Sequence, residues 1–210
     1  MAVRTTATSP TGPSNVSSAS NTATSLTAPT PRGQRTRDAL IHATASLVAE
    51  RGFHAVGISD IGAAAGVSGA AIYRHFANKD ELLAAVFESV VDELIDGARR
   101  ATTLAMLIDA HVSFAIRHRT VIRVYEQEAH NLSQESYRRV RRQQRRYANL
   151  WVAIVAQEHP AWTPAIANAA VHATFGLINS VSNYRPTLPA PEHRRLLIEL
   201  ATQVLAPTNN

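Results

Sequence analysis

The side chains whose types and spacing suggest a chemical role are concentrated in residues 58–83, ISDIGAAAGVSGAAIYRHFANKDELL. This stretch predicts two short helices joined by a turn at Gly66, with Ile61 and Ile72 on their inward faces. The second helix then presents small residues at its start and polar or aromatic residues toward its end. A helix that enters the major groove of DNA needs this order, because its first residues meet base edges while later ones contact phosphates. The residues predicted on this outward side are Ser68, Gly69, Ala70, Tyr73, Arg74 and His75.

These residues and their surroundings resemble the TetR family of bacterial transcriptional regulators. The resemblance rests on AGVS at 65–68, IYRHF at 72–76 and NKDELL at 78–83, with ERGF at 50–53 before them. It extends from about Arg35 to Phe87. The family resemblance implies an N-terminal three-helix DNA-binding domain followed by a larger helical domain for ligand binding and dimerisation.

The resemblance also implies roles for individual residues. In relatives, phosphates are contacted at the positions of Tyr73, His75 and Lys79, the last of which begins the next helix. The remaining contacts implied are one to the DNA backbone from Arg35 and contacts to bases from Ser68, Gly69 and Ala70.

The chain departs from the family pattern at the start of the second helix. Many relatives have Thr or Ser there, followed by a basic residue, whereas this chain has Gly57-Ile58-Ser59. Ser59 can cap the helix or contact a phosphate, but no arginine is placed there to read a guanine. We therefore expect thymine methyl contacts and DNA shape to contribute more to specificity. The same departure leaves open an adaptor that no longer reads DNA specifically.

Other chemistries receive little support from the sequence. Glu126 and His130 are four residues apart and could ligate a metal together with His111 or His118, so a metal-sensing regulator is an alternative. No HExxH, nucleophile elbow, P-loop or GxGxxG motif is present, and cysteine is absent. We therefore expect no enzymatic activity, no cofactor and no disulfide.

Periodicity predicts an all-α chain. Of 210 residues, 45% are hydrophobic and 18% charged, which is the composition of a folded soluble protein, and no segment could span a membrane. We expect a cytoplasmic protein. The predicted helices are 34–51, 59–65, 68–76, one long helix starting after Asn78, and 104–118, 119–131, 134–158, 163–183 and 192–205. Asn78 and Glu81 predict a capping box at the start of the long helix.

The chain is expected to divide into three parts. Residues 1–31 are rich in Ser, Thr and Pro and have almost no large apolar side chains, so we expect a disordered tail. Residues 32–78 form the predicted helix-turn-helix domain. Residues 79–210 form the predicted helical domain for ligand binding and dimerisation.

The C-terminal part contains the features of an effector pocket and of a dimer interface. The helix predicted at 163–183 is apolar nearly all round, and the helix at 192–205 has an apolar stripe. Pairing them with a second copy as a four-helix bundle would bury both, and the alternative is the ordinary core of a monomer. The polar and aromatic residues that fall on apolar faces are the candidates for a pocket: Phe114, Tyr125, Asn131, Tyr147, Trp151, His172, Phe175 and Asn179. Each of them could equally be an ordinary core residue.

Residues 138–146 contain six arginines in nine residues. They could form a solvated face paired with Glu126, Glu128 and Glu135, or an anion site at the mouth of a cavity, for example for the phosphates of an acyl-CoA. The net charge of +5 therefore indicates nucleic acid only weakly, because much of the arginine lies outside the DNA-binding motif. The sequence as a whole predicts a homodimeric repressor that binds a palindromic operator and is released by a small hydrophobic or acyl-CoA-like effector.

Overall fold

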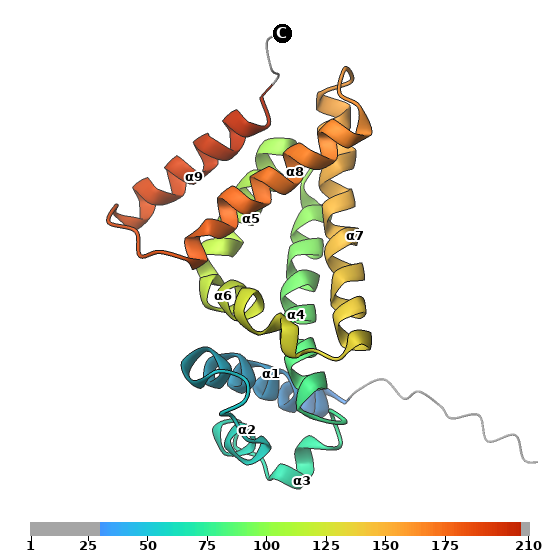
Figure 1. Ribbon diagram of the computed structural model, residues 1–210, viewed down its shortest axis with the longest axis vertical. Coiled ribbons are helices and arrows are strands. Elements are labelled where there is room, and N and C mark those ends of the chain that lie inside the picture. Colours follow the sequence, from blue (N-terminus) through green and yellow to red (C-terminus); the bar gives the residue numbers. More distant parts are fainter. Residues whose placement is uncertain (1–29, 207–210) are drawn as a thin grey trace, which may run out of the picture.

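The computed structural model describes residues 30–206 (Figure 1). Within this range the chain is all-α, as the periodicity predicts, and contains no β-strand. Residues 1–29 of the predicted disordered tail lie outside the described residues, whereas Thr30 and Pro31 already begin the first helix. The helices of the described range are α1 (Pro31–Arg51), α2 (Ile58–Ala64), α3 (Gly69–Ile72), α4 (Lys79–Arg100), α5 (Leu104–Arg117), α6 (Arg119–Glu128), α7 (Gln134–Glu158), α8 (Pro164–Asn179) and α9 (Ala190–Val204).

Helices α1, α2 and α3 form one end of the molecule (Figure 1). The turn between α2 and α3 depends on two glycines. Gly66 has φ of 69°, a conformation that side chains with a Cβ atom rarely adopt. At Gly62 a Cβ atom would lie 2.8 Å from the carbonyl oxygen of Val67, so only glycine allows the turn to pack this closely. Helix α3 is shorter than predicted, since turns follow it from Tyr73 to His75.

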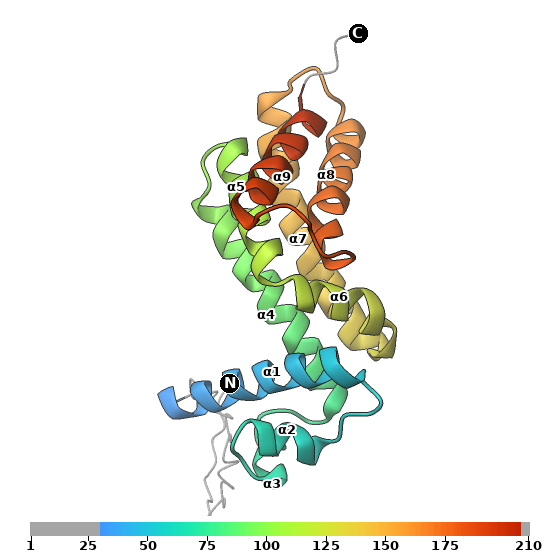
Figure 2. The ribbon, with the colours of Figure 1, turned by 90° about the vertical axis from the view of Figure 1, so that its left-hand side faces the viewer.

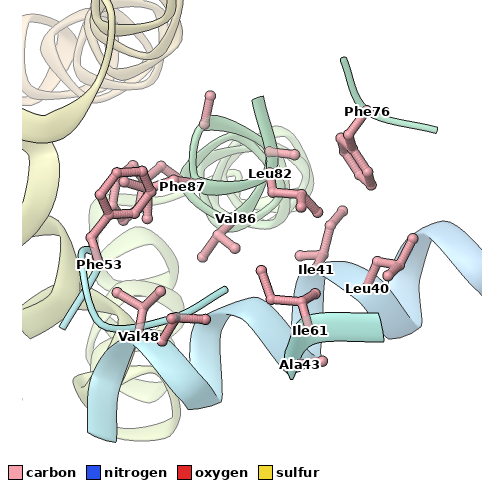
Figure 3. Close-up of a cluster of buried hydrophobic side chains, with 14 of the residues drawn as sticks. Leu40, Ile41, Ala43, Val48, Phe53, Ile61, Phe76, Leu82, Val86 and Phe87 are labelled. Carbon is pink, nitrogen blue, oxygen red and sulfur yellow. The ribbon is translucent and has the colours of Figure 1, made fainter. Parts of the chain in front are cut away.

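An apolar core holds these three helices against the first half of α4 (Figure 3). Leu40 of α1, Ile61 of α2 and Leu82 of α4 are fully buried within it. Because Leu82–Phe87 belong to this core, α4 is shared between the two predicted domains, and residues 32–78 have no complete core without it.

A second apolar core lies between the second half of α4 and helices α5, α7, α8 and α9. Trp151 of α7 and Val171 of α8 are fully buried in it. Helix α7 runs beside α4 along most of its length, so these two helices connect both ends of the molecule (Figure 1). Two predicted helices end early in 3₁₀ turns, at Ala129–Asn131 after α6 and at Ser180–Ser182 after α8.

The outer surface of α8 and α9 remains apolar in the single chain. Helix α9 packs over α5 and α8 (Figure 2). It exposes Leu196, Leu200 and Val204, which lie four residues apart on one face. Ile166 of α8 is also exposed. None of the helices in residues 30–206 is long and apolar enough to cross a membrane.

Candidate functional site

The predicted DNA-reading face lies at the far end of the molecule from α9 (Figure 1). Packing fixes its orientation, because Ile72 and Phe76 are buried in the first core. On the opposite side Tyr73 is 59% exposed. The other predicted contact residues Ser59, Ser68, Ala70, Arg74 and Arg35 are exposed, and Gly69 and His75 are half-buried.

Lys79 has protein partners that the sequence did not reveal. Its Nζ donates to the carbonyl oxygens of Phe53, at 2.8 Å, and of Val56, at 3.0 Å. It also lies 4.1 Å from the centre of the Phe53 ring, a cation–π contact. Lys79 therefore ties the segment between α1 and α2 to the start of α4. An ammonium group has three N–H donors, so one is left for the predicted phosphate.

The candidate effector site is a cavity of about 280 Å³ between α4, α5, α6, α7 and α8. Its closed end is built from buried side chains such as Val91, Phe114 and Tyr147. Its open end is formed by exposed side chains, among them Glu126 of α6 and Arg141 of α7. The cavity is thus lined mainly by apolar side chains with a few polar groups, as is usual for a small-molecule site, and has charged groups at its mouth.

The structure brings together six of the eight predicted pocket residues: Phe114, Tyr125, Tyr147, His172, Phe175 and Asn179. Trp151 is not in the cavity wall but lies behind it, with its ring centre 5.1 Å from that of Phe175. Asn131 does not belong to the site. Its amide donates to Glu128 at 2.7 Å in the turn after α6, because the helix ends at Glu128 and turns Asn131 away.

The most deeply buried polar group of the cavity is His111, which the sequence suggested only as a metal ligand. Its Nδ1 lies 2.9 Å from the Tyr147 hydroxyl and its Nε2 lies 3.2 Å from Asn179 Oδ1. Burial disfavours the charged ring and lowers the pKa of His111 to about 4, although the hydrogen bond to Asn179 acts in the opposite direction. A signal was present in the sequence, since His111 falls on the apolar face of α5 beside Leu107 and Ile108.

The buried His111 is expected to make stability depend on pH. In the unfolded chain a histidine takes up a proton below about pH 6.5, whereas in the folded chain His111 stays neutral until about pH 4. His111 therefore does not affect the free energy of unfolding above about pH 6.5. Between about pH 6.5 and pH 4 it lowers this free energy as the pH decreases. Between pH 7 and pH 4 we expect wild type to lose about 3 kcal/mol more unfolding free energy than His111→Gln. Urea unfolding followed by circular dichroism measures this difference.

The control for that measurement is His172→Gln, because His172 lines the same cavity but is exposed. It should retain the pH dependence of the wild type. Equal pH dependence of His111→Gln and wild type would contradict the assignment of a neutral, buried His111.

The arginines of the cluster at 138–146 have different surroundings. Arg141 and Arg145 reach the mouth of the cavity. Arg139 instead forms ion pairs with Glu81, at 2.9 Å, and with Glu88, both on α4. The prediction that these arginines pair with Glu126, Glu128 and Glu135 was wrong. Within residues 30–206 none of the three glutamates forms an ion pair with an arginine of this cluster. Arg139 lies on the side of α7 that packs against α4, and its side chain therefore reaches the glutamates of α4.

Arg139 is part of a polar connection that we call the α4–α7 clamp, which consists of Asp80, Glu81 and Glu88 of α4 with Ser133, Ser136 and Arg139 at the start of α7. The backbone N–H of Ser133 donates to Asp80 at 2.7 Å, and the hydroxyls of Ser133 and Ser136 donate to the same carboxylate at 2.9 and 2.7 Å. The carboxylates of Glu88 and Glu81 raise the pKa of Arg139. The predicted capping box is therefore only half formed: Asn78 accepts from the Glu81 N–H at 2.9 Å, while the Glu81 side chain binds Arg139.

The alternative metal site is not assembled. Glu126 accepts a hydrogen bond from Ser182 at 3.0 Å, and His130 is exposed on the turn after α6. His111 is occupied by Tyr147 and Asn179. In the described part of the chain no group of three or more His, Asp or Glu side chains could hold a metal ion.

A helix-turn-helix at one end and a cavity among helices at the other define the class of helical regulators that combine a DNA-binding motif and an effector site in one chain. Comparisons with known sequences agree. Residues 40–86 match the family described as "Bacterial regulatory proteins, tetR family", and residues 97–187 match "Tetracyclin repressor-like, C-terminal domain". The chain belongs to the TetR family, whose members are transcriptional regulators and not enzymes.

Characterised relatives are similar over part of their length. The transcriptional activator FasR of Mycolicibacterium smegmatis is 42% identical over 71 residues, which are 34% of this chain and 32% of FasR. The transcriptional repressor KstR2 of Rhodococcus jostii is 25% identical over 132 residues, which are 59% of this chain and 64% of KstR2. The chain thus spans less than two thirds of the length of these relatives.

Solved structures share the fold at low sequence identity. The TetR-family regulator PfmR from Thermus thermophilus has a TM-score of 0.66 and 20% identity, covering 78% of this chain and 97% of PfmR. KstR2 of Mycobacterium tuberculosis has a TM-score of 0.62 and 24% identity, with coverages of 80% and 92%. AibR, solved in complex with isovaleryl coenzyme A and operator DNA, has a TM-score of 0.66 and 15% identity, with coverages of 79% and 97%.

Proposed function

We propose that this protein is a cytoplasmic, homodimeric repressor that binds a palindromic operator and is released by an effector in the central cavity. The observation that carries this proposal is the exposed face of α3 at one end of α4, together with a cavity further along α4 that is lined by residues between Phe87 and Leu94 of that helix. Ser68, Gly69 and Ala70 are assigned to base contacts. Phosphate and backbone contacts are assigned to Arg35, Ser59, Tyr73, Arg74, His75 and Lys79.

For the effector we propose an acyl-CoA or a similar amphipathic anion. The cavity offers an apolar interior for an acyl group, and Arg141 and Arg145 at its mouth suit phosphates, which arginine binds in a bidentate manner. The fold is shared with AibR, which was solved with isovaleryl coenzyme A bound. Release follows if the effector favours an arrangement in which two recognition helices no longer match major grooves about 34–36 Å apart.

Electrophoretic mobility shift on the DNA upstream of the protein's own gene tests this proposal, with acetyl-, isovaleryl- and octanoyl-CoA as candidate effectors. We expect a shift that at least one of the three thioesters reverses. Absence of a shift at low salt would contradict the repressor, whereas a shift that no thioester affects would contradict only the effector class. A transcriptional fusion in a strain lacking the protein should show increased expression, and decreased expression would indicate an activator.

The dimer is proposed to form through α8 and α9. Leu196, Leu200 and Val204 form an exposed apolar stripe on α9, and a second copy related by a two-fold axis would cover it. Leu200→Glu should produce a monomer in analytical ultracentrifugation and reduce operator affinity at least tenfold, because each half-site then binds alone. The control is Thr202→Glu, on a different face of α9, which should remain dimeric. A dimeric Leu200→Glu would contradict this interface.

A further inference from the structure

The closed end of the cavity contains a polar group of three side chains from three helices: His111 of α5, Tyr147 of α7 and Asn179 of α8. Aromatic rings surround it. The centre of the His111 ring lies 4.9 Å from that of Phe175 and 5.6 Å from that of Trp151. His111 is 2% exposed and Tyr147 is 5% exposed. Polar groups at such depth need partners, and their hydrogen bonds fix which atoms remain for a ligand.

The direction of each hydrogen bond follows from the donors and acceptors available. Asn179 Oδ1 can only accept, so the Nε2 of the neutral His111 carries the proton and donates to it. His111 Nδ1 then has a lone pair and accepts the hydroxyl proton of Tyr147. Burial, which raises the pKa of the Tyr147 hydroxyl, keeps that proton in place.

This arrangement leaves one amide donor available to a ligand in the cavity, on the half-buried Asn179. The Nδ2 of Asn179 has two N–H groups, and among residues 30–206 it donates to no protein acceptor. Asn179 itself lines the cavity. With the proton on His111 Nε2, the hydrogen bond to Oδ1 directs the two N–H groups of Asn179 away from His111.

We infer that Asn179, oriented by His111 and Tyr147, recognises a neutral oxygen atom of the effector, a carbonyl or a hydroxyl at the end that enters the cavity first. A carboxylate is disfavoured there, since no cationic side chain lies at the closed end and the surroundings are aromatic. Positive charge is found at the mouth instead, on Arg141 and Arg145. An amphipathic effector is therefore oriented with its anionic part outward and its neutral oxygen inward.

This inference rests on the proposed function only in that the cavity is the effector site. It does not require that the effector be a CoA thioester. A purely structural role for the three residues makes a different prediction. If their hydrogen bonds only connect helices, substituting Asn179 should change the affinity for all ligands of equal shape by the same factor.

Two small molecules of matched shape test the inference: acetophenone, which has a carbonyl oxygen, and isopropylbenzene, in which a methyl group replaces it. Binding to the full chain is measured by ligand-observed NMR titration. Wild type should bind acetophenone about three- to tenfold more tightly, the contribution expected of one neutral hydrogen bond. In Asn179→Asp, which retains an acceptor for His111 but lacks the N–H donors, the preference should be lost or reversed.

Two further variants keep the result interpretable. Asn179→Leu also lacks the donors and should lose the preference, so the test remains decisive if Asn179→Asp does not fold. Asn149→Leu makes the same change at an exposed asparagine of α7 outside the cavity and should retain the wild-type preference.

The inference would be overturned if wild type bound both molecules equally, if neither bound, or if the Asn179 variants weakened both ligands by the same factor. Failure of the proposed effector class would be recognised separately. In that case acetophenone is preferred as expected, while acetyl-, isovaleryl- and octanoyl-CoA leave the operator complex intact.

Discussion

Lys79→Ala is expected to reduce operator affinity by more than about tenfold on every DNA sequence, with little change in which sequence is preferred. Two effects combine. The substitution removes one positive charge from the predicted phosphate-binding surface. It also leaves the carbonyl oxygens of Phe53 and Val56 without the lysine that bonds them, which loosens the segment between α1 and α2.

The dependence of binding on salt separates these effects. If Lys79 contacts a phosphate, the slope of log affinity against log salt concentration should fall by about 1 in Lys79→Ala. If Lys79 only connects the helices, operator affinity and the midpoint of urea unfolding should fall, while the salt dependence of binding stays unchanged. Fluorescence anisotropy with a labelled operator at several salt concentrations measures the slope.

Ser68→Ala is the matched control for Lys79→Ala, because Ser68 is exposed at the start of α3 and carries no charge. It should change the relative affinity for variant operators and leave the salt slope at its wild-type value. A change of operator preference in Lys79→Ala would contradict its assignment to a sequence-independent contact.

Lys79 also shows how far the sequence can predict this structure. The helices and the outward face of α3 follow from periodicity and from turn glycines, because those signals are local. The partners of Lys79 are backbone carbonyls more than twenty positions earlier in the chain. No pattern of residue types marks a carbonyl oxygen, so only the fold can show that this lysine has a structural role.

The cavity was predictable to the extent that its residues are aromatic or polar on apolar helix faces. That rule found Tyr147, Phe175 and Asn179. It failed for Asn131, because the end of α6 at Glu128 changes which way the following residues point. The same rule covers His111 on the apolar face of α5, but not its hydrogen bonds, since the partners come from α7 and α8 and only packing brings them within reach.

Arg139→Leu is expected to weaken the response of operator binding to the effector. Helix α7 carries cavity residues such as Tyr147 and Arg145, while its first turns hold the start of α4 through the α4–α7 clamp. Lys79, the residue before Asp80, binds the segment that leads into α2. We therefore expect a displacement of α7 by a ligand to reach the proposed DNA-binding helices through side chains in direct contact.

The measurable quantity is the ratio of operator affinities without and with effector. Coupling of this kind typically amounts to about 5–150-fold. We expect the ratio to fall at least about fivefold in Arg139→Leu, because Glu81 and Glu88 lose their common partner and only the hydrogen bonds of Asp80 remain in the clamp. The effector in this experiment is whichever acyl-CoA releases the wild-type protein from its operator.

Arg142→Leu provides the matched control for Arg139→Leu. Arg142 lies one turn further along α7, is exposed, and forms no ion pair within the described residues. It carries the same change of charge, so a general electrostatic effect on DNA binding would appear in both variants. A reduced ratio in Arg139→Leu alone would assign the transmission to the α4–α7 clamp. An unchanged ratio in Arg139→Leu would exclude the clamp as the route, and the contact of α6 with α1 would then be the connection through which the cavity reaches the DNA-binding end.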